Sequence, residues 1–305
     1  MPSPEAVTND GGIFDAEFLA RLRLLFVRLR RRRRQARQGV QESPAAGHSR
    51  EFRDHRHYAR GDDIRTVDWR LYGRLDRLFV RVFESVQEFH VHVVVDTSAS
   101  MADPHPVKRI AALRLAAALA YLGLSQQHRV ALIGVDRACR RELPPLKGPG
   151  HIHAIIRRLV DLPFAGIGDL DAALAAFRPD GGRRGVVFLI SDLLGGDPAR
   201  TRELARRFAS WPGETHVLHV LDPAEERAPA EGELLLVDSE TGAERRVWLD
   251  RDAAQRYAAQ VVAWRDGIAK ECLGRRIDYL RWDAAAPFDD QFVTLLERGS
   301  GLAGT

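Results

Sequence analysis

Apolar residues in the part of the chain after residue 88 follow a repeating order of two patterns. Continuously apolar runs, such as residues 90–96 (HVHVVVD) and 185–192 (GVVFLISD), are typical of strands that are buried on both faces. Stretches of helical length separate them. This alternation predicts an α/β fold with a doubly wound, mostly parallel sheet that is covered by helices on both faces. The expected strands are residues 90–96, 129–135, 185–192, 215–221 and 276–282, the expected helices are residues 106–125, 150–161, 169–177, 198–210, 253–272 and 288–298, and a hairpin is expected at 232–249.

The beginning of the chain is organised differently. Five apolar residues recur at helical spacing between Phe14 and Leu29, which predicts a helix with arginines on its other faces. A polar stretch without a clear period follows at residues 51–78, and a strand is expected at 78–83. Trp69, within the polar stretch, is expected to be buried. We therefore predict an N-terminal helical and irregular or β appendage and a larger α/β domain, with bounds at residues 1–86 and 87–300.

Basic charge is concentrated in one segment. Residues 19–37 contain nine arginines, from Arg21 to Arg37, and no acid; without them the net charge of +4 would become −5. Such a tract could anchor the chain on nucleic acid or on an anionic membrane, because clustered cations release counterions on binding. The tract lacks the interleaved aromatics that stack on bases. A solvated basic helix, or a docking face for an acidic partner, is therefore favoured.

Cysteine usage and the first residues indicate the compartment. Cys139 and Cys272 lie far apart and form no CxxC pair, which argues against a disulfide framework and against a zinc–thiolate site. The chain starts MPSPEA, without a basic segment ahead of an apolar core, so no signal peptide is expected. We expect a cytoplasmic protein.

Two of the expected strands run into carboxylates, Asp96 and Asp192. In a doubly wound sheet, ligands bind at the carboxyl ends of the strands. After the first strand the chain reads Asp96-Thr97-Ser98-Ala99-Ser100, and alternate residues of an extended segment project the same way. Hard oxygen ligands in this number suit Mg²⁺, or alternatively Mn²⁺ or Ca²⁺, with a position left for a partner's carboxylate. The simpler alternative is that Asp96 and Ser98 only cap the next helix.

The same residues carry a resemblance to known families. The loop from Asp96 to Ser100 resembles the metal-ion-dependent adhesion site of von Willebrand factor A domains. Residues 56–69 (RHYARGDDIRTVDW) closely resemble the bacterial family known as domain of unknown function 58, which joins such a segment to a von Willebrand factor A-like domain. The resemblance covers most of residues 45–300. Members of that family are often encoded beside MoxR-type AAA ATPases, which implies a partner role in the assembly or remodelling of complexes.

The resemblance assigns ligands residue by residue. Asp96, Ser98 and Ser100 correspond to the first adhesion-site loop, and Asp192 corresponds to the aspartate of the third. The threonine of the second loop falls at Gly168, which has no hydroxyl. Asp169 could reach the ion instead, directly or through water. A degenerate metal site is therefore one expected outcome.

The GDDxRxVDW segment allows two interpretations. Asp62, Asp63 and Asp68 could act as catalytic acids. Arginines lie among them, however, and Arg–carboxylate pairs can fix an irregular loop. We therefore favour a structural or interaction role for this segment. The residues concerned are Asp62, Asp63, Arg65, Asp68 and Trp69.

The sequence gives no support for nucleotide or serine hydrolysis, because it contains neither GxxxxGK[ST] nor GxSxG. We predict a non-enzymatic, metal-dependent protein–protein interaction module that works with a MoxR-type AAA ATPase. Two alternatives stay open. One is a Mg²⁺-dependent phosphohydrolase that uses Asp96, Asp192 and the acids of residues 62–68, and the other is an Arg-anchored scaffold on nucleic acid or membrane.

Overall fold

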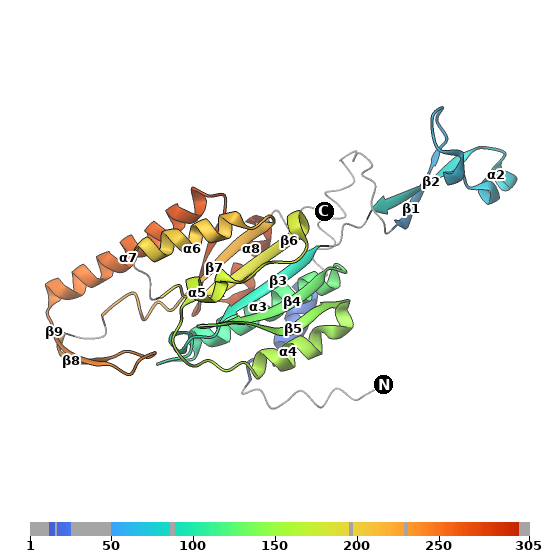
Figure 1. Cartoon of the computed structure of the whole chain (residues 1–305). Coiled ribbons are helices and arrows are strands. Elements are labelled where there is room, and N and C mark those ends of the chain that lie inside the picture. Colours follow the sequence, from blue (N-terminus) through green and yellow to red (C-terminus); the bar gives the residue numbers. More distant parts are fainter. Residues whose placement is uncertain are drawn as a thin grey trace. The chain divides into compact units, whose positions relative to one another are not determined.

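The computed structural model of the chain divides into two compact units, one of residues 31–88 and one of residues 1–30 together with 89–305 (Figure 1). The residues described are 12–15, 17–25, 50–85, 89–194, 198–228 and 231–298. Residues 26–37, which include Leu29 and most of the basic tract, lie outside the described ranges. No helix within the described ranges is both long and apolar enough to cross a bilayer.

A six-stranded sheet forms the centre of the larger unit. Its order is β10-β7-β6-β3-β4-β5, and every neighbouring pair is parallel except β4 with β5. The predicted doubly wound, mostly parallel sheet is therefore confirmed. Edge strand β5 was missed, because its sequence CRRELPPLK is polar and holds two prolines, unlike a buried parallel strand. The strands are β3 (His90–Asp96), β4 (Arg129–Val135), β5 (Cys139–Lys147), β6 (Gly185–Ser191), β7 (Glu214–Leu221) and β10 (Asp278–Asp283).

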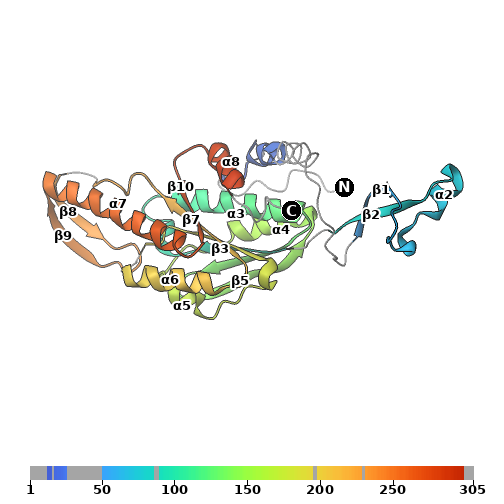
Figure 2. The same cartoon turned by 90° about the horizontal axis from the view of Figure 1, so that it is seen from above.

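Helices cover both faces of this sheet (Figure 2). Successive side chains of a strand point to opposite faces, so Val93 and Val95 enter one apolar core and Val94 enters the other. The first core contains α3 (Val107–Ser125), α4 (Ile152–Val160) and α8 (Phe288–Arg298), and the second contains α5 (Leu170–Ala175), α6 (Pro198–Ser210) and α7 (Arg251–Leu273). Three short 3-10 helices complete the loops: η2 (Ala99–Met101), η3 (Pro149–His151) and η4 (Gly182–Arg184).

The described part of the N-terminal helix, residues 17–25, packs on the larger unit. Phe14, Phe18 and Leu22 are buried in the core that contains α3 and α8. Arg114 of α3 donates from Nε to the carbonyl oxygen of Ile13 at 2.9 Å. The apolar stripe read from the sequence thus joins this helix to the α/β domain, whereas the sequence alone had grouped it with the segment that follows.

The smaller unit is a two-stranded antiparallel ribbon of β1 (Arg50–His57) and β2 (Phe79–Ser85), which flank η1 (Ile64–Thr66) and α2 (Trp69–Leu75). Strand β1 and helix α2 were not expected from the sequence. The expectation that Trp69 is buried is wrong, because its exposed fraction is 58%. A two-stranded ribbon with one short helix has no second layer to cover the indole.

A second ribbon projects from the larger unit. Strands β8 (Gly232–Val237) and β9 (Glu244–Leu249) form the predicted hairpin. Its turn is closed by Asp238, whose carboxylate accepts hydrogen bonds from the amides of Glu240 and Thr241 at 2.9 and 2.8 Å. The tip of the hairpin points back to the end of β3 (Figure 1).

Candidate metal site

The carboxyl ends of β3 and β6 meet at the switch point of the sheet. From β3 the chain passes through α3 to β4 on one side, and it later returns through β6 on the other side. A crevice outside the sheet forms where the crossovers diverge in this way. Asp96 is the last residue of β3 and Asp192 directly follows β6, so both carboxylates lie at this edge, and both are buried.

The first loop gathers its oxygen atoms at one point. The hydroxyl of Ser98 donates to Asp96 Oδ1 at 2.7 Å, and the Ser98 amide donates to the same oxygen at 3.0 Å. The hydroxyl oxygens of Ser98 and Ser100 are 3.0 Å apart. Adjacent ligands of an octahedral Mg²⁺ ion lie about 2.9 Å apart, given Mg–O distances of about 2.0–2.1 Å. The two hydroxyls are thus spaced as neighbouring ligands of such an ion.

The hydrogen bonds to the Asp96 carboxylate compensate only part of the cost of burying its negative charge. Its Oδ2 accepts a hydrogen bond from Ser191 Oγ at 2.5 Å, and Ser191 Oγ accepts in turn from the amide of Leu193 at 2.9 Å. Burial, together with the charge of Asp192, nevertheless raises the pKa of Asp96 to about 7. Additional positive charge at this place would stabilise the ionised carboxylate.

Asp192 already faces a cation of the protein itself. Lys108 Nζ, in the first turn of α3, donates to Asp192 Oδ2 at 2.7 Å and lies 2.6 Å from Glu225 Oε1. Only 2% of Lys108 is exposed. Burial lowers the pKa of Lys108, but the charges of Asp192 and Glu225 outweigh it, and the pKa lies above its usual range. The third loop is therefore partly neutralised by this ammonium group.

The second loop lies directly against the first. The amide of Ala99 donates to the carbonyl oxygen of Gly166 at 3.0 Å, and the amide of Ala165 donates to that of Thr97 at 3.0 Å. Asp169 does not contribute its carboxylate to this contact. Its Oδ1 accepts from the amide of Ala172 at 3.1 Å and so caps helix α5.

These residues fit a divalent cation. No cluster of three or more His, Cys, Asp or Glu side chains arranged for a metal ion occurs in the described part of the chain. Two donors of this site are hydroxyls, however. The Ser98 proton is directed to Asp96, which leaves oxygen lone pairs for an ion. Ser98 and Ser100 would hold the ion directly, and Asp96 and Asp192 would balance its charge.

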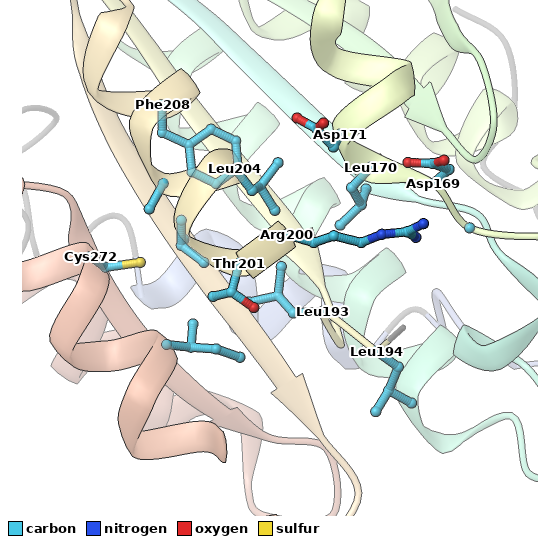
Figure 3. A pocket seen from close by; sticks show the side chains of 14 residues that line it. Asp169, Leu170, Asp171, Leu193, Leu194, Arg200, Thr201, Leu204, Phe208 and Cys272 are labelled. Carbon is cyan, nitrogen blue, oxygen red and sulfur yellow. The ribbon is translucent and has the colours of Figure 1, made fainter. Parts of the chain in front are cut away.

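Two cavities flank the site. One, of about 60 Å³, lies between α5, α6 and α7, where Asp169 and the Arg200 guanidinium are at the end opposite Cys272 (Figure 3). The other, of about 460 Å³, reaches Asp192 and carries acidic and aromatic side chains. Its lining includes Asp192, Asp222, Glu225, Glu226, Tyr257 and Trp264. The larger cavity lies next to the third loop.

In the smaller unit, Asp62 is engaged in a local ion pair. Arg56 donates from Nη1 and Nη2 to the two carboxylate oxygens of Asp62, each at 2.6 Å, and the amide of Ala59 donates to Oδ2 at 2.9 Å. Hydrogen bonding to Arg56 lowers the pKa of Asp62 to about 2. This bidentate ion pair fixes the conformation of the irregular loop.

The two other acids of this segment cap helices. Asp63 accepts from the amide of Arg65 at 2.9 Å at the start of η1. Asp68 accepts from the amide of Arg70 at 3.0 Å at the start of α2, and its Oδ2 lies 3.0 Å from His55 Nε2. Exposed Trp69 follows directly. The three aspartates are thus engaged in holding the backbone.

The chain is similar over most of its length to known proteins of one family. The model of the family described as "Protein of unknown function DUF58" matches residues 54–266, which is more than half of the chain. The chain belongs to the DUF58 family. The uncharacterized protein Rv1480 of Mycobacterium tuberculosis is 30% identical over 269 residues, covering 87% of this chain and 84% of the relative.

This DUF58 chain also matches solved structures at low sequence identity. BatB from Bacteroides thetaiotaomicron is 18% identical, with a TM-score of 0.39, and the match covers 71% of this chain and 100% of the BatB chain. A von Willebrand factor type A protein from Catenulispora acidiphila is 13% identical, with a TM-score of 0.35, and covers 64% of this chain and 44% of its own. The doubly wound α/β architecture of the DUF58 chain itself follows from its sheet order and its two helical layers.

Four residues near the DUF58 site were not expected from the sequence. Lys108 offered a signal, because it is one of only three lysines and stands in a helix rich in alanine and leucine. Ser191, directly before Asp192, offered a weaker one. Nothing in the local sequence marked Glu225 or Glu240, whose approach depends entirely on the fold.

Proposed function

We propose that this DUF58 chain is a non-enzymatic, metal-dependent protein-interaction module that binds a MoxR-type AAA ATPase. The contacts that join Asp96, Ser98 and Ser100, next to the buried Asp192 at the end of the neighbouring strand, support the proposal. A Mg²⁺ ion held largely by hydroxyls keeps much of its charge, so it attracts a carboxylate of the partner. The MoxR-type ATPase is the partner class that the family resemblance implies.

The hydrogen bonds around the serines support a binding role over a catalytic one. The hydroxyl of Ser98 is directed to Asp96 and adjoins that of Ser100, so neither is paired with a histidine base. The imidazole of His219, which contacts the third loop, is engaged through Nε2 with the carbonyl oxygen of Asp192 at 2.8 Å. Burial lowers the pKa of His219 to about 4, which makes it a poor proton acceptor at neutral pH.

Metal binding is tested by thermal unfolding. We expect Mg²⁺ to raise the melting temperature of the wild type, but not that of Asp96→Ala or Ser100→Ala. Ligand at about 100 times Kd stabilises by about 2.7 kcal/mol, or roughly 5–10 °C for a domain of this size. Ser210→Ala, which removes a hydroxyl bonded only to the Arg207 carbonyl, is the matched control. Equal shifts in the wild type and in Ser100→Ala would refute the site.

Partner binding is tested with a MoxR-type ATPase from the same genome. We expect the wild type to capture it in Mg²⁺ but not in a chelator, and Ser100→Ala to fail in both. Capture that ignores both the chelator and Ser100→Ala would contradict metal dependence. Phosphatase turnover in Mg²⁺ that Asp192→Asn abolishes would favour the phosphohydrolase alternative instead.

We propose an interaction role for the smaller unit too. Its acids hold the backbone, and several apolar side chains stay exposed, among them Ile64 at 62%, Trp69 at 58% and Leu75 at 54%. We expect Trp69→Ala to weaken capture of the ATPase about tenfold or more, while the free energy of unfolding changes by about 0.5 kcal/mol or less. Exposed Trp248→Ala on β9 is the control. Equal capture by Trp69→Ala and the wild type would dismiss this surface.

A further inference from the structure

The turn of the β8–β9 hairpin places a carboxylate at the second loop of the site. Glu240 Oε2 accepts a hydrogen bond from the amide of Gly168 at 3.1 Å. Glu240 is half-buried, in contrast to exposed Asp238 in the same turn. The bonds from Asp238 to the amides of Glu240 and Thr241 hold the turn that presents this side chain.

Gly168 leaves the space that the carboxylate occupies. A Cβ atom at Gly168 would lie 3.3 Å from Glu240 Oε1, 3.0 Å from Ser98 Cβ and 3.4 Å from Ser98 Oγ. A side chain there would therefore compete with Glu240, and it would stand beside the Ser98 hydroxyl. The φ angle of Gly168 is not positive, so its backbone conformation does not itself require glycine.

We propose that Glu240 is the second-loop ligand of the metal site, supplying the oxygen that Gly168 lacks. This inference rests on the proposed metal-dependent function. The lost threonine and the gained carboxylate are then two parts of one arrangement: glycine opens the loop, and a hairpin more than 60 residues later fills the opening. The ligand set gains a negative charge that a threonine would not bring, which strengthens its hold on a hard divalent cation.

A carboxylate from the same chain has a consequence for partner binding. An acidic side chain of the partner that approaches the ion meets Glu240 on the second-loop side. The partner must therefore use another free position of the ion or displace the tip of the hairpin. The larger cavity beside Asp192, on the third-loop side, offers the first route.

The test measures metal affinity apart from any activity. Mn²⁺ is titrated by electron paramagnetic resonance, and Mg²⁺ by calorimetry, on the full chain. We expect Glu240→Gln to weaken binding about 10- to 100-fold. Glutamine keeps an acceptor for the Gly168 amide, so hydrogen exchange at that amide should stay close to wild type. Glu244→Gln, on strand β9 of the same hairpin, should bind metal as the wild type does.

A compensating variant tests the exchange of one ligand for another. We expect Glu240→Ala to bind weakly, and Gly168→Thr combined with Glu240→Ala to recover affinity, because the hydroxyl returns to the second loop. Wild-type affinity in Glu240→Gln, with binding still lost in Ser100→Ala, would overturn the Glu240 inference and leave the proposed function standing. A wild type that binds neither ion would overturn both.

Discussion

Replacing Lys108 with methionine is expected to destabilise the chain by about 3–5 kcal/mol. The substitution keeps the length and apolar stem of the side chain but removes a buried ammonium that lies between Asp192 and Glu225. Breaking a buried ion pair from one side leaves uncompensated charge, which costs about this much. Urea unfolding in a chelating buffer measures the loss. Lys270→Met, at an exposed position of α7, should change the free energy of unfolding by about 0.5 kcal/mol or less.

A substitution of Asp192, the ion-pair partner of Lys108, tests whether unpaired charge causes this loss of stability. Adding Asp192→Asn to Lys108→Met removes one of the stranded carboxylates, so we expect the double variant to be more stable than Lys108→Met alone. Mg²⁺ should also stabilise Lys108→Met more than the wild type, because the ion would then replace the missing cation beside Asp192. A double variant that is less stable than either single variant would show that packing, and not charge, is the main role of Lys108.

Acidification is expected to remove stability through His219. This ring is fully buried, with Nδ1 2.6 Å from the Tyr279 hydroxyl and Nε2 2.8 Å from the Asp192 carbonyl oxygen. Burial lowers its pKa from 6.5 to about 4. The unfolded chain therefore takes up this proton first as the pH falls. The contribution is complete above pH 6.5 and declines toward pH 4, by about 3 kcal/mol in total.

Asp96 acts in the opposite direction and must be separated from this effect. Its pKa is raised from 3.8 to about 7, so the folded chain binds that proton first, and its contribution favours folding as the pH falls from 7. The informative quantity is thus the difference between variants. Between pH 7.5 and 4.5, His219→Gln should lose about 2–3 kcal/mol less than the wild type. His153→Gln, on the exposed face of α4, should follow the wild type. Parallel profiles for His219→Gln and the wild type would contradict this account.

Local pattern determined the architecture of the larger unit. Runs such as 90–96 and 185–192 are apolar on both faces, and only a sheet covered by two helical layers buries both faces. Ligands of such a sheet bind at the carboxyl ends of its strands, so the placement of Asp96 and Asp192 at these ends could be predicted without coordinates. The convergence of Ser98 and Ser100 followed from their spacing alone.

The apolar pattern did not predict the elements whose buried positions lack a helical or strand period. Strand β5 lies at the edge of the sheet, and β1 and α2 lie in a unit too small to bury a face, so none of them shows the apolar repeat of a core element. Trp69 was expected to be buried because large aromatics usually are, yet its own two-stranded unit has no second layer to cover it.

The charge balance and the completeness of the site were decided by tertiary structure alone. Lys108 meets Glu225, more than 100 residues later in the chain, and Gly168 meets Glu240, more than 60 residues later, and both contacts exist only after the crossovers of the sheet have formed. Sequence fixes which oxygens stand at the ends of β3 and β6, because strand and side-chain direction are local properties. Which charges surround those oxygens is a property of the fold, because electrostatic neighbours are set by distance in space and not by distance along the chain.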